Sequence, residues 1–206
     1  MFYETATNDH GLPYNPLKAC VLPRPIGWIS TLNGKGQANL APFSFFNLVS
    51  ERPPLVIFCP NGPHAEGGEK DSLLNLRENP EFVVNLATYS LRHEINASAA
   101  PWQRDKNEFE AAGVTEAASV LVSPPRVKES PLHLECTLEQ IIQLPGEVGG
   151  VPNHMVLGRI LGVHVDDEMI VDGQVRPERL QAISRLGYMD YAVVDKIFTM
   201  PRPTTV

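Results

Sequence analysis

The chain has 206 residues, of which 43% are hydrophobic and 20% charged, which is enough apolar material for a globular core. Its 17 basic and 24 acidic residues give a net charge of -7, which argues against binding to nucleic acid or to an anionic membrane. The sequence contains neither an apolar run of the roughly 20 residues that span a bilayer nor a secretory signal. We therefore expect a single domain over residues 1–206, located in the cytoplasm.

The cysteines and histidines carry no recognisable metal or disulfide pattern. Cys20, Cys59 and Cys136 are widely spaced, form no C-x-x-C pair and are odd in number. The six histidines form no H-E-x-x-H motif. We expect core thiols in a reducing compartment and no metal site.

The first predicted elements are short strands separated by proline and glycine. Residues 26–32 are rich in apolar and β-branched side chains, and Asn33-Gly34-Lys35-Gly36 favours a tight hairpin to a return strand over residues 37–40. Residues 55–59 form a compact apolar run that ends at Pro60. That pattern is typical of a buried strand closed by a turn.

The middle of the chain mixes helices with one strand. Asp71 or Ser72 can cap a short helix that runs through Leu76. Residues 81–86 predict a strand. A helical pattern over residues 90–100 ends at Pro101, and a second helical piece over residues 108–112 ends at Gly113.

The last third is again mainly β. Alternation over residues 132–144 predicts a long strand, residues 146–153 a loop, and residues 155–165 a second long strand. Asp172-Gly173 predicts a hairpin turn, and residues 185–194 close the domain. At least six strands at hairpin spacing favour a mainly antiparallel barrel. A doubly wound sheet is disfavoured because no G-x-G-x-x-G follows a strand.

The densest cluster of chemically useful residues lies in the first predicted hairpin. Ser30 and Thr31 would come close to the segment around Asn39, and the aromatic-rich residues 42–46 follow at once. Hydroxyls and backbone N–H groups beside aromatic rings would suit a planar ligand with polar edges. The alternative is that these aromatic side chains are simply core.

Two further segments combine polar groups with backbone features. Lys70-Asp71-Ser72 joins a cation, a hydroxyl and the free N–H groups of a helix start, which together can hold a phosphate. The alternative is an exposed lysine beside an ordinary helix cap.

The second of these segments is residues 184–191, which contains Arg185 and Tyr191. Gly187 lies between them and allows the backbone to approach another group closely. The alternative is a surface turn before the last strand.

Taken in order, these segments resemble the flavin reductase-like family of FMN-binding split barrels, which includes flavoredoxin-type proteins. The motifs that carry the resemblance are R-P-I-G-W-I-S-T at residues 24–31, N-L-A-P-F-S-F-F-N at 39–47, P-P-L-V-I-F at 53–58, K-D-S at 70–72, N-P-E-F-V-V-N at 79–85 and R-L-G at 185–187. The resemblance covers residues 16–192. It implies a mainly β, Greek-key split barrel with a few short helices, a homodimer, and FMN held noncovalently near the subunit interface.

The resemblance also implies roles for individual residues. The phosphate or ribityl contacts would be Ser30, Thr31, Lys70 and Ser72, and the wall against the isoalloxazine would be Asn39, Ala41, Pro42, Phe43, Ser44 and Phe45. Arg185 and Tyr191 would reach the flavin or the partner chain. Ser72 stands where relatives usually have Thr, and Tyr188 replaces a second glycine. Arg24 would either neutralise the phosphate or pin the entry loop.

A member of this family would move hydride from NADH or NADPH through FMN to free flavin, for a partner oxygenase, or to another small acceptor. The flavin N5 would carry the chemistry, so no side chain is predicted as a nucleophile. One alternative is an FMN-binding electron carrier without hydride chemistry of its own. Another is a cofactor-free structural or interaction domain.

Overall fold

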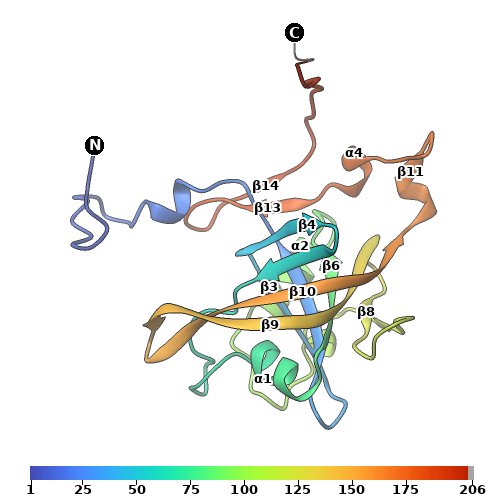
Figure 1. Cartoon of the computed structure of the whole chain (residues 1–206), viewed down its shortest axis with the longest axis horizontal. Coiled ribbons are helices and arrows are strands. Elements are labelled where there is room, and N and C mark those ends of the chain that lie inside the picture. Colours follow the sequence, from blue (N-terminus) through green and yellow to red (C-terminus); the bar gives the residue numbers. More distant parts are fainter. Residues whose placement is uncertain (204–206) are drawn as a thin grey trace.

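A seven-stranded antiparallel sheet organises the computed structural model, which describes residues 1–203 (Figure 1). The strand order is β3-β2-β6-β9-β10-β5-β4, so β3 and β4 are the two edges. The strands are β2 (Gly27–Leu32), β3 (Ala38–Phe43), β4 (Phe46–Glu51), β5 (Pro54–Phe58), β6 (Glu81–Leu86), β9 (Leu132–Val148) and β10 (Val151–Val165). The chain is a mainly β split barrel, as the sequence predicts.

Smaller elements surround this sheet. The short strands are β1 (Arg24–Pro25), β13 (Ile183–Arg185) and β14 (Tyr191–Val193) in one sheet, and β7 (Glu116–Ala117), β8 (Arg126–Val127), β11 (Ile170–Val171) and β12 (Gln174–Val175) in two ribbons. The helices are α1 (Asp71–Glu78), α2 (Arg92–Ser98), α3 (Glu108–Ala112) and α4 (Pro177–Leu180), with 3-10 turns at Leu17–Ala19 and Asp167–Met169. Over residues 1–203, every helix is too short or too polar to cross a membrane.

The first hairpin forms where the sequence predicts it. β2 pairs with β3 so that Ser30 lies opposite Leu40 and Thr31 opposite Asn39. Asn33 Oδ1 accepts hydrogen bonds from the backbone N–H groups of Lys35 and Gln37, at 2.9 and 3.0 Å, and Gly36 has a φ of 77°. The turn therefore depends on an asparagine side chain and on a glycine in the left-handed region.

The second long hairpin differs from the expected strand, loop and strand. β9 and β10 continue pairing through residues 146–153, with Val151 opposite Val148, and the chain reverses only at Gly149-Gly150. Both glycines have positive φ, 60° and 76°. Two such residues are enough for a tight hairpin, so the predicted loop is wrong and the strands are longer.

The N-cap of α1 lies one residue before the first predicted cap, Asp71, and two before the second, Ser72. Lys70, with φ -65° and ψ 146°, is the N-cap and its side chain caps nothing. Asp71 and Ser72 are instead the first two helical residues. Their backbone N–H groups precede the first i to i-4 bond and have no partner within the helix.

The core lies on both faces of β2, since successive strand residues point to opposite sides. Trp28 packs in a cluster with Leu40, Ile95 and Phe109, which brings α2 and α3 onto one face. Ile29 packs in a second cluster that includes residues of α1, β5 and β6. A side chain at position 158 of β10 would collide with the ring of Phe82, so this strand position requires glycine.

Arg24 ties the N-terminal segment to the hairpin formed by β13 and β14. Its side chain is only 8% exposed, and the guanidinium donates to the carbonyl oxygens of Lys18, Val21 and Leu186, the last two at 2.7 Å. A Cβ at Gly187 would meet Ala19, so the two segments touch closely. Of the two roles left open by the sequence, Arg24 therefore has the structural one of pinning the entry loop.

Replacing Arg24 with alanine should lower the free energy of unfolding by about 3 kcal/mol, because three carbonyl groups lose a charged donor at a buried position. Urea unfolding followed by circular dichroism measures the change. Arg92→Ala is the matched control, since Arg92 is exposed and donates only to the carbonyl of Tyr89. Unchanged stability in the Arg24 variant would contradict the pinning role.

Candidate functional site

A cavity of about 280 Å³ opens beside the edge strand β3. It is bordered by six of the residues that the sequence predicts as site residues: Asn39, Ala41, Pro42, Phe43, Lys70 and Ser72. The remaining lining residues are Pro63, His64, Ala65, Asp71, Ser98, Ala99, Ala100, Pro101, Trp102 and Glu108. The structure thus brings the end of a strand and the start of a distant helix to one cavity.

The β3 side of this cavity is apolar and rigid. Ala41, Pro42 and Phe43 are half-buried, and the Phe43 ring packs against Phe58 with a centroid separation of 5.2 Å. Pro42 has no N–H to offer a further strand, which suits a position at the edge of a sheet. A flat apolar ligand would find a pre-formed wall here.

Two further cavities meet the first at Pro42. One, of about 440 Å³, is lined by Pro42, Phe43, Ser44 and Phe45 together with Lys18, Cys59, Asn61, Gly62, Val148 and Asn153. The other, of about 140 Å³, places Ser44 near Arg185 and Tyr191. Ten of the twelve predicted site residues therefore border this run of three cavities.

The helix end of the first cavity is suited to an anion. The N-cap Lys70 and the unpartnered backbone N–H groups of the first turn of α1 lie beside the Ser72 hydroxyl. Burial lowers the pKa of Lys70, with nearby Arg104 adding to that shift and Asp71 opposing it. An anion bound here would restore the balance of charge around the ammonium group.

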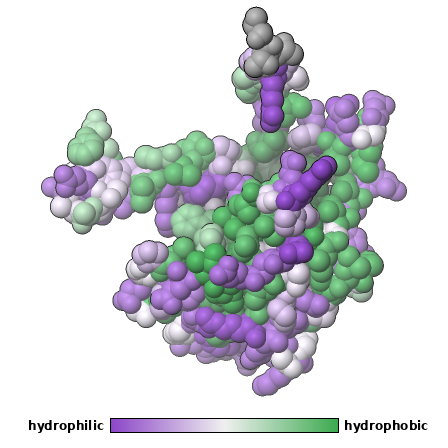
Figure 2. Space-filling model, in the orientation of Figure 1, coloured by the Kyte–Doolittle hydropathy of each residue, from purple (hydrophilic) through white to green (hydrophobic). Residues whose placement is uncertain are grey.

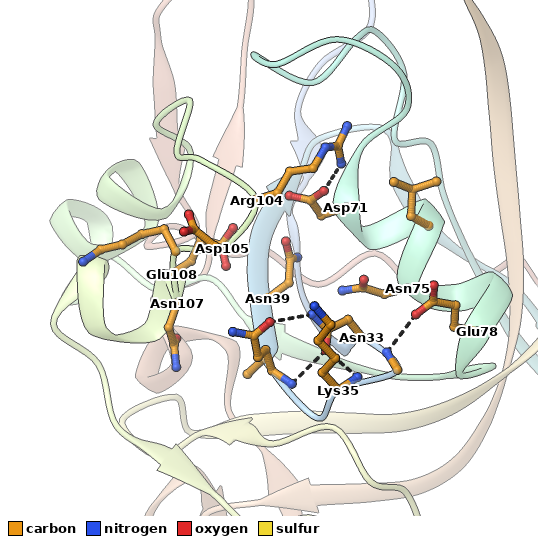
Figure 3. Close-up of a pocket in the computed structure, with 15 residues that line it drawn as sticks. Asn33, Lys35, Asn39, Asp71, Asn75, Glu78, Arg104, Asp105, Asn107 and Glu108 are labelled. Carbon is orange, nitrogen blue, oxygen red and sulfur yellow. Dashed lines mark hydrogen bonds and ion pairs between the residues drawn. The ribbon is translucent and has the colours of Figure 1, made fainter.

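The carboxylate of Asp71 is held away from such an anion by its own partners. Arg104 forms an ion pair with Asp71 and also donates to the carbonyl oxygens of Gly67 and Glu69, at 2.7 and 2.9 Å. His64 Nε2 lies 3.3 Å from the other carboxylate oxygen of Asp71. Figure 3 shows Arg104 reaching across to α1 at this point.

Comparison with known proteins identifies the family of this chain. The family model for the flavin reductase like domain matches residues 19–180. A protein of Halalkalibacterium halodurans is 36% identical over 191 residues, covering 93% of this chain and 91% of its own.

This chain belongs to the flavin reductase-like family.

Two solved structures are also similar to this member of the family. The nitrilotriacetate monooxygenase component B from Bacillus cereus has a TM-score of 0.87 and 30% identity, over 97% of this chain and 98% of its own. The 2-nitrobenzoate 2-nitroreductase of Pseudomonas fluorescens has a TM-score of 0.85 and 27% identity, over 100% and 98%.

Two predicted site residues lie outside the three cavities. Ser30 and Thr31 are fully buried. Ser30 Oγ donates to the carbonyl oxygen of Pro125 at 2.6 Å, and Thr31 Oγ1 accepts from Asn75 Nδ2 at 3.0 Å. Neighbouring residues of a strand point to opposite faces, so both could not face one ligand. In this structure they serve as internal hydrogen-bond partners, and Thr31 fastens α1 to β2.

Arg185 and Tyr191 form a unit of their own on the β13–β14 hairpin. The guanidinium donates to the Tyr191 hydroxyl and to the carbonyl oxygen of Tyr188, and it lies over the Tyr191 ring at 4.5 Å. Tyr188 has a φ of 54°, the left-handed conformation that glycine usually occupies. Tyr188 therefore adopts the turn conformation that a glycine would supply.

The opposite wall comes from the segment over residues 90–113, for which the sequence leaves open a place over the mouth of the barrel or a plain packing role. Ser98, the last residue of α2, and residues 99–102 line the first cavity together with β3, and Trp102 Nε1 donates to the carbonyl oxygen of Ala97 at 3.0 Å. The segment over residues 90–113 thus supplies one side of the site. Within this segment, Trp102 lines the first cavity, Arg104 holds Asp71, and His93 lies in a separate cavity.

Glu108 is a site residue that the sequence did not reveal. It lines the first cavity and also a polar cavity of about 220 Å³ behind it, between α1 and the turn at residues 33–37 (Figure 3). Burial raises the pKa of Glu108 to about 7; backbone N–H groups of Glu108 and Leu40 oppose the rise and Asp71 adds to it. A charged residue at a helix start usually faces water, so only the packing of α3 on β3 identifies it as buried.

Proposed function

We propose that this protein binds FMN noncovalently and catalyses hydride transfer from NADH or NADPH to a small acceptor. The observation that carries the proposal is that one cavity joins an apolar strand wall, Ala41–Phe43, to an anion-binding helix start, Lys70–Ser72. A phosphorylated tricyclic ring needs both ends at once. A cofactor-free domain would need neither.

The donor set around the cavity fits such a ligand. A lysine, a hydroxyl and free backbone N–H groups form charge-assisted hydrogen bonds with a phosphate. The three cavities that meet at Pro42 offer room beyond the phosphate end, with half-buried Phe43 and exposed Phe45 as ring neighbours. The acidic net charge does not oppose binding, because charges beyond a Debye length of roughly 8 Å are screened.

In the mechanism, the polypeptide binds and orients. Lys70, Ser72 and the first N–H groups of α1 would fix the phosphate, while Ala41, Pro42 and Phe43 would hold the ring plane against β3. The bound flavin supplies the atom that accepts hydride. Backbone N–H groups along the β3 edge would stabilise negative charge at the polar ring edge, and Ser98–Trp102 would exclude water from one side.

The acceptor is proposed by analogy with similar proteins. The Bacillus cereus protein is named as a component of a monooxygenase, and the Pseudomonas fluorescens protein as a nitroreductase. We propose free flavin, supplied to a partner oxygenase, or another small reducible molecule. A cytoplasmic location suits three free thiols at Cys20, Cys59 and Cys136.

Purified protein mixed with FMN should show flavin absorption bands shifted from those of free FMN, and NADH or NADPH should bleach those bands under anaerobic conditions. Stopped-flow absorbance measures the rate. Rapid bleaching by one of the two nucleotides is the expected result, because the open side of the cavity leaves a ring face for the nicotinamide.

Two outcomes would contradict this proposal in different ways. Bleaching by a reduced protein donor alone would show an electron carrier without hydride chemistry. A colourless protein that takes up no added FMN would show a structural or interaction domain.

The double variant Lys70→Ala, Ser72→Ala should bind FMN more weakly by about 2 to 4 kcal/mol, since hydrogen bonds to charged groups contribute about 1.5 to 3 kcal/mol each. That loss corresponds to a roughly 30- to 1,000-fold higher Kd, measured by fluorescence titration. Lys128→Ala is the control because Lys128 is exposed and borders none of the three cavities. Equal affinity in a folded double variant would remove the helix start from the site.

We also propose that the protein works as a homodimer. The chain exposes 12336 Å², whereas a compact monomer of 22.7 kDa exposes about 9,500 Å². The excess accompanies the two terminal segments, which stand away from the body in Figures 1 and 2. Large apolar side chains are exposed there: Met1, Phe2, Leu12, Tyr14, Leu17, Val21, Leu22, Ile197, Phe198 and Met200. Such surface favours burial against a second copy.

Light scattering after size exclusion should therefore give twice the chain mass of 22.7 kDa. Truncation of residues 1–12 should weaken the dimer, because it removes part of the exposed apolar surface. A monomer at micromolar concentration would contradict the proposal.

A further inference from the structure

The carboxyl group of Glu108 occupies a position that flavin binding alone does not explain. The side chain is 8% exposed, and its Oε2 has no hydrogen-bond partner within residues 1–203. It stands between the first cavity and the polar cavity behind it, so it forms part of the partition between them. A buried carboxyl with an unpaired oxygen is costly as an anion and much less so when protonated.

Asn39 connects this carboxyl to the anion end of the site. One end of its side-chain amide lies 3.2 Å from Glu108 Oε1, and the other lies 3.1 Å from Ser72 Oγ. The amide has one donating and one accepting end, so its orientation depends on which neighbour donates. The three side chains form a continuous chain from Glu108 to the helix start.

The ionised form of Glu108 orients this chain in one direction. A carboxylate only accepts, so the Asn39 amide must turn its nitrogen toward Glu108 and its oxygen toward Ser72 and the backbone N–H of Leu40, both at 3.1 Å. The Ser72 hydroxyl then donates to Asn39.

The neutral form keeps this direction. The opposite orientation would place Asn39 Nδ2 3.1 Å from the backbone nitrogen of Leu40, so that two donors would face each other. A proton on the unpaired Oε2 instead leaves Oε1 free to accept from Asn39 as before. Neutralisation thus removes one negative charge from the wall of the proposed anion site without changing the hydrogen-bond chain.

We propose that Glu108 couples anion binding at Lys70 and Ser72 to the uptake of one proton, because its charge lies in the wall of the same cavity. The proposal rests on the proposed FMN site. It gives the flavin a pH-dependent affinity: bound when Glu108 is neutral, released more readily when Glu108 is ionised. The proton comes from solvent and returns there.

The other charged groups around Glu108 leave its carboxyl group free to take up and release a proton. Arg104 is committed to Asp71 and to two backbone carbonyls, so it does not neutralise Glu108. The remaining charged or titratable groups on the elements and cavity walls around Glu108 are Lys35, His64, Lys70, Arg77, Glu78, Asp105, Lys106 and Glu110, together with Arg92, His93 and Glu94 on the packed helix α2.

The test is the Kd for FMN between pH 6 and 9 in the wild type and in Glu108→Gln, which mimics the neutral acid. With a pKa of about 7, the neutral form is about one part in thirty at pH 8.5, so wild-type affinity should be about 10- to 30-fold weaker than that of E108Q there. The two should agree near pH 6. Titration of the FMN phosphate affects both proteins equally and cancels in the ratio. A ratio that does not change with pH would overturn the proposal.

A second measurement needs no variant. Calorimetric titration of the wild type with FMN at pH 8, in two buffers of different ionisation enthalpy, should show uptake of close to one proton. Absence of uptake would overturn the proposal. Failure of the wild type to bind FMN would instead overturn the proposed function.

Discussion

The free edge of β3 is the feature on which the whole site depends. As the first strand of the seven-stranded sheet, β3 is paired only with β2, and its other side is met by α1 and α3. Asn39 and Leu40 face the polar partners Ser72 and Glu108 there, and Ala41–Phe43 form an apolar wall. An unpaired edge usually invites association with another strand. Here α1 and α3 pack beside the edge and leave a cavity along it, which is where we propose that the flavin binds.

Local charge pairing makes the proposed anion site compatible with a net charge of -7. Asp71 lies at the helix start, where its carboxylate would compete with a phosphate, but Arg104 and His64 hold it. Arg104 also fastens the segment before α1 to the segment between α2 and α3. One guanidinium thereby positions two walls of the cavity and compensates the nearest acid.

Much of the fold follows from the sequence, because its signals are local. The Asn33–Gly36 turn, the apolar runs and the alternation over residues 132–144 each act within a few residues, and the corresponding strands form. The predicted loop over residues 146–153 is too long because Gly149-Gly150 lies within a longer region of turn-forming residues. Only part of the candidate site can be predicted from the sequence. Ser30 and Thr31 carry suitable groups, yet their hydroxyls are used inside the protein, and the importance of Glu108 comes from burial by elements distant in sequence.

A crystal structure of the protein with FMN bound tests the central claim most directly. The account predicts the phosphate within hydrogen-bond distance of Lys70 Nζ and the first backbone N–H groups of α1, with the ring plane against Ala41–Phe43. A flavin bound away from β3, with the cavity between this strand and α1 filled only by water, would contradict it.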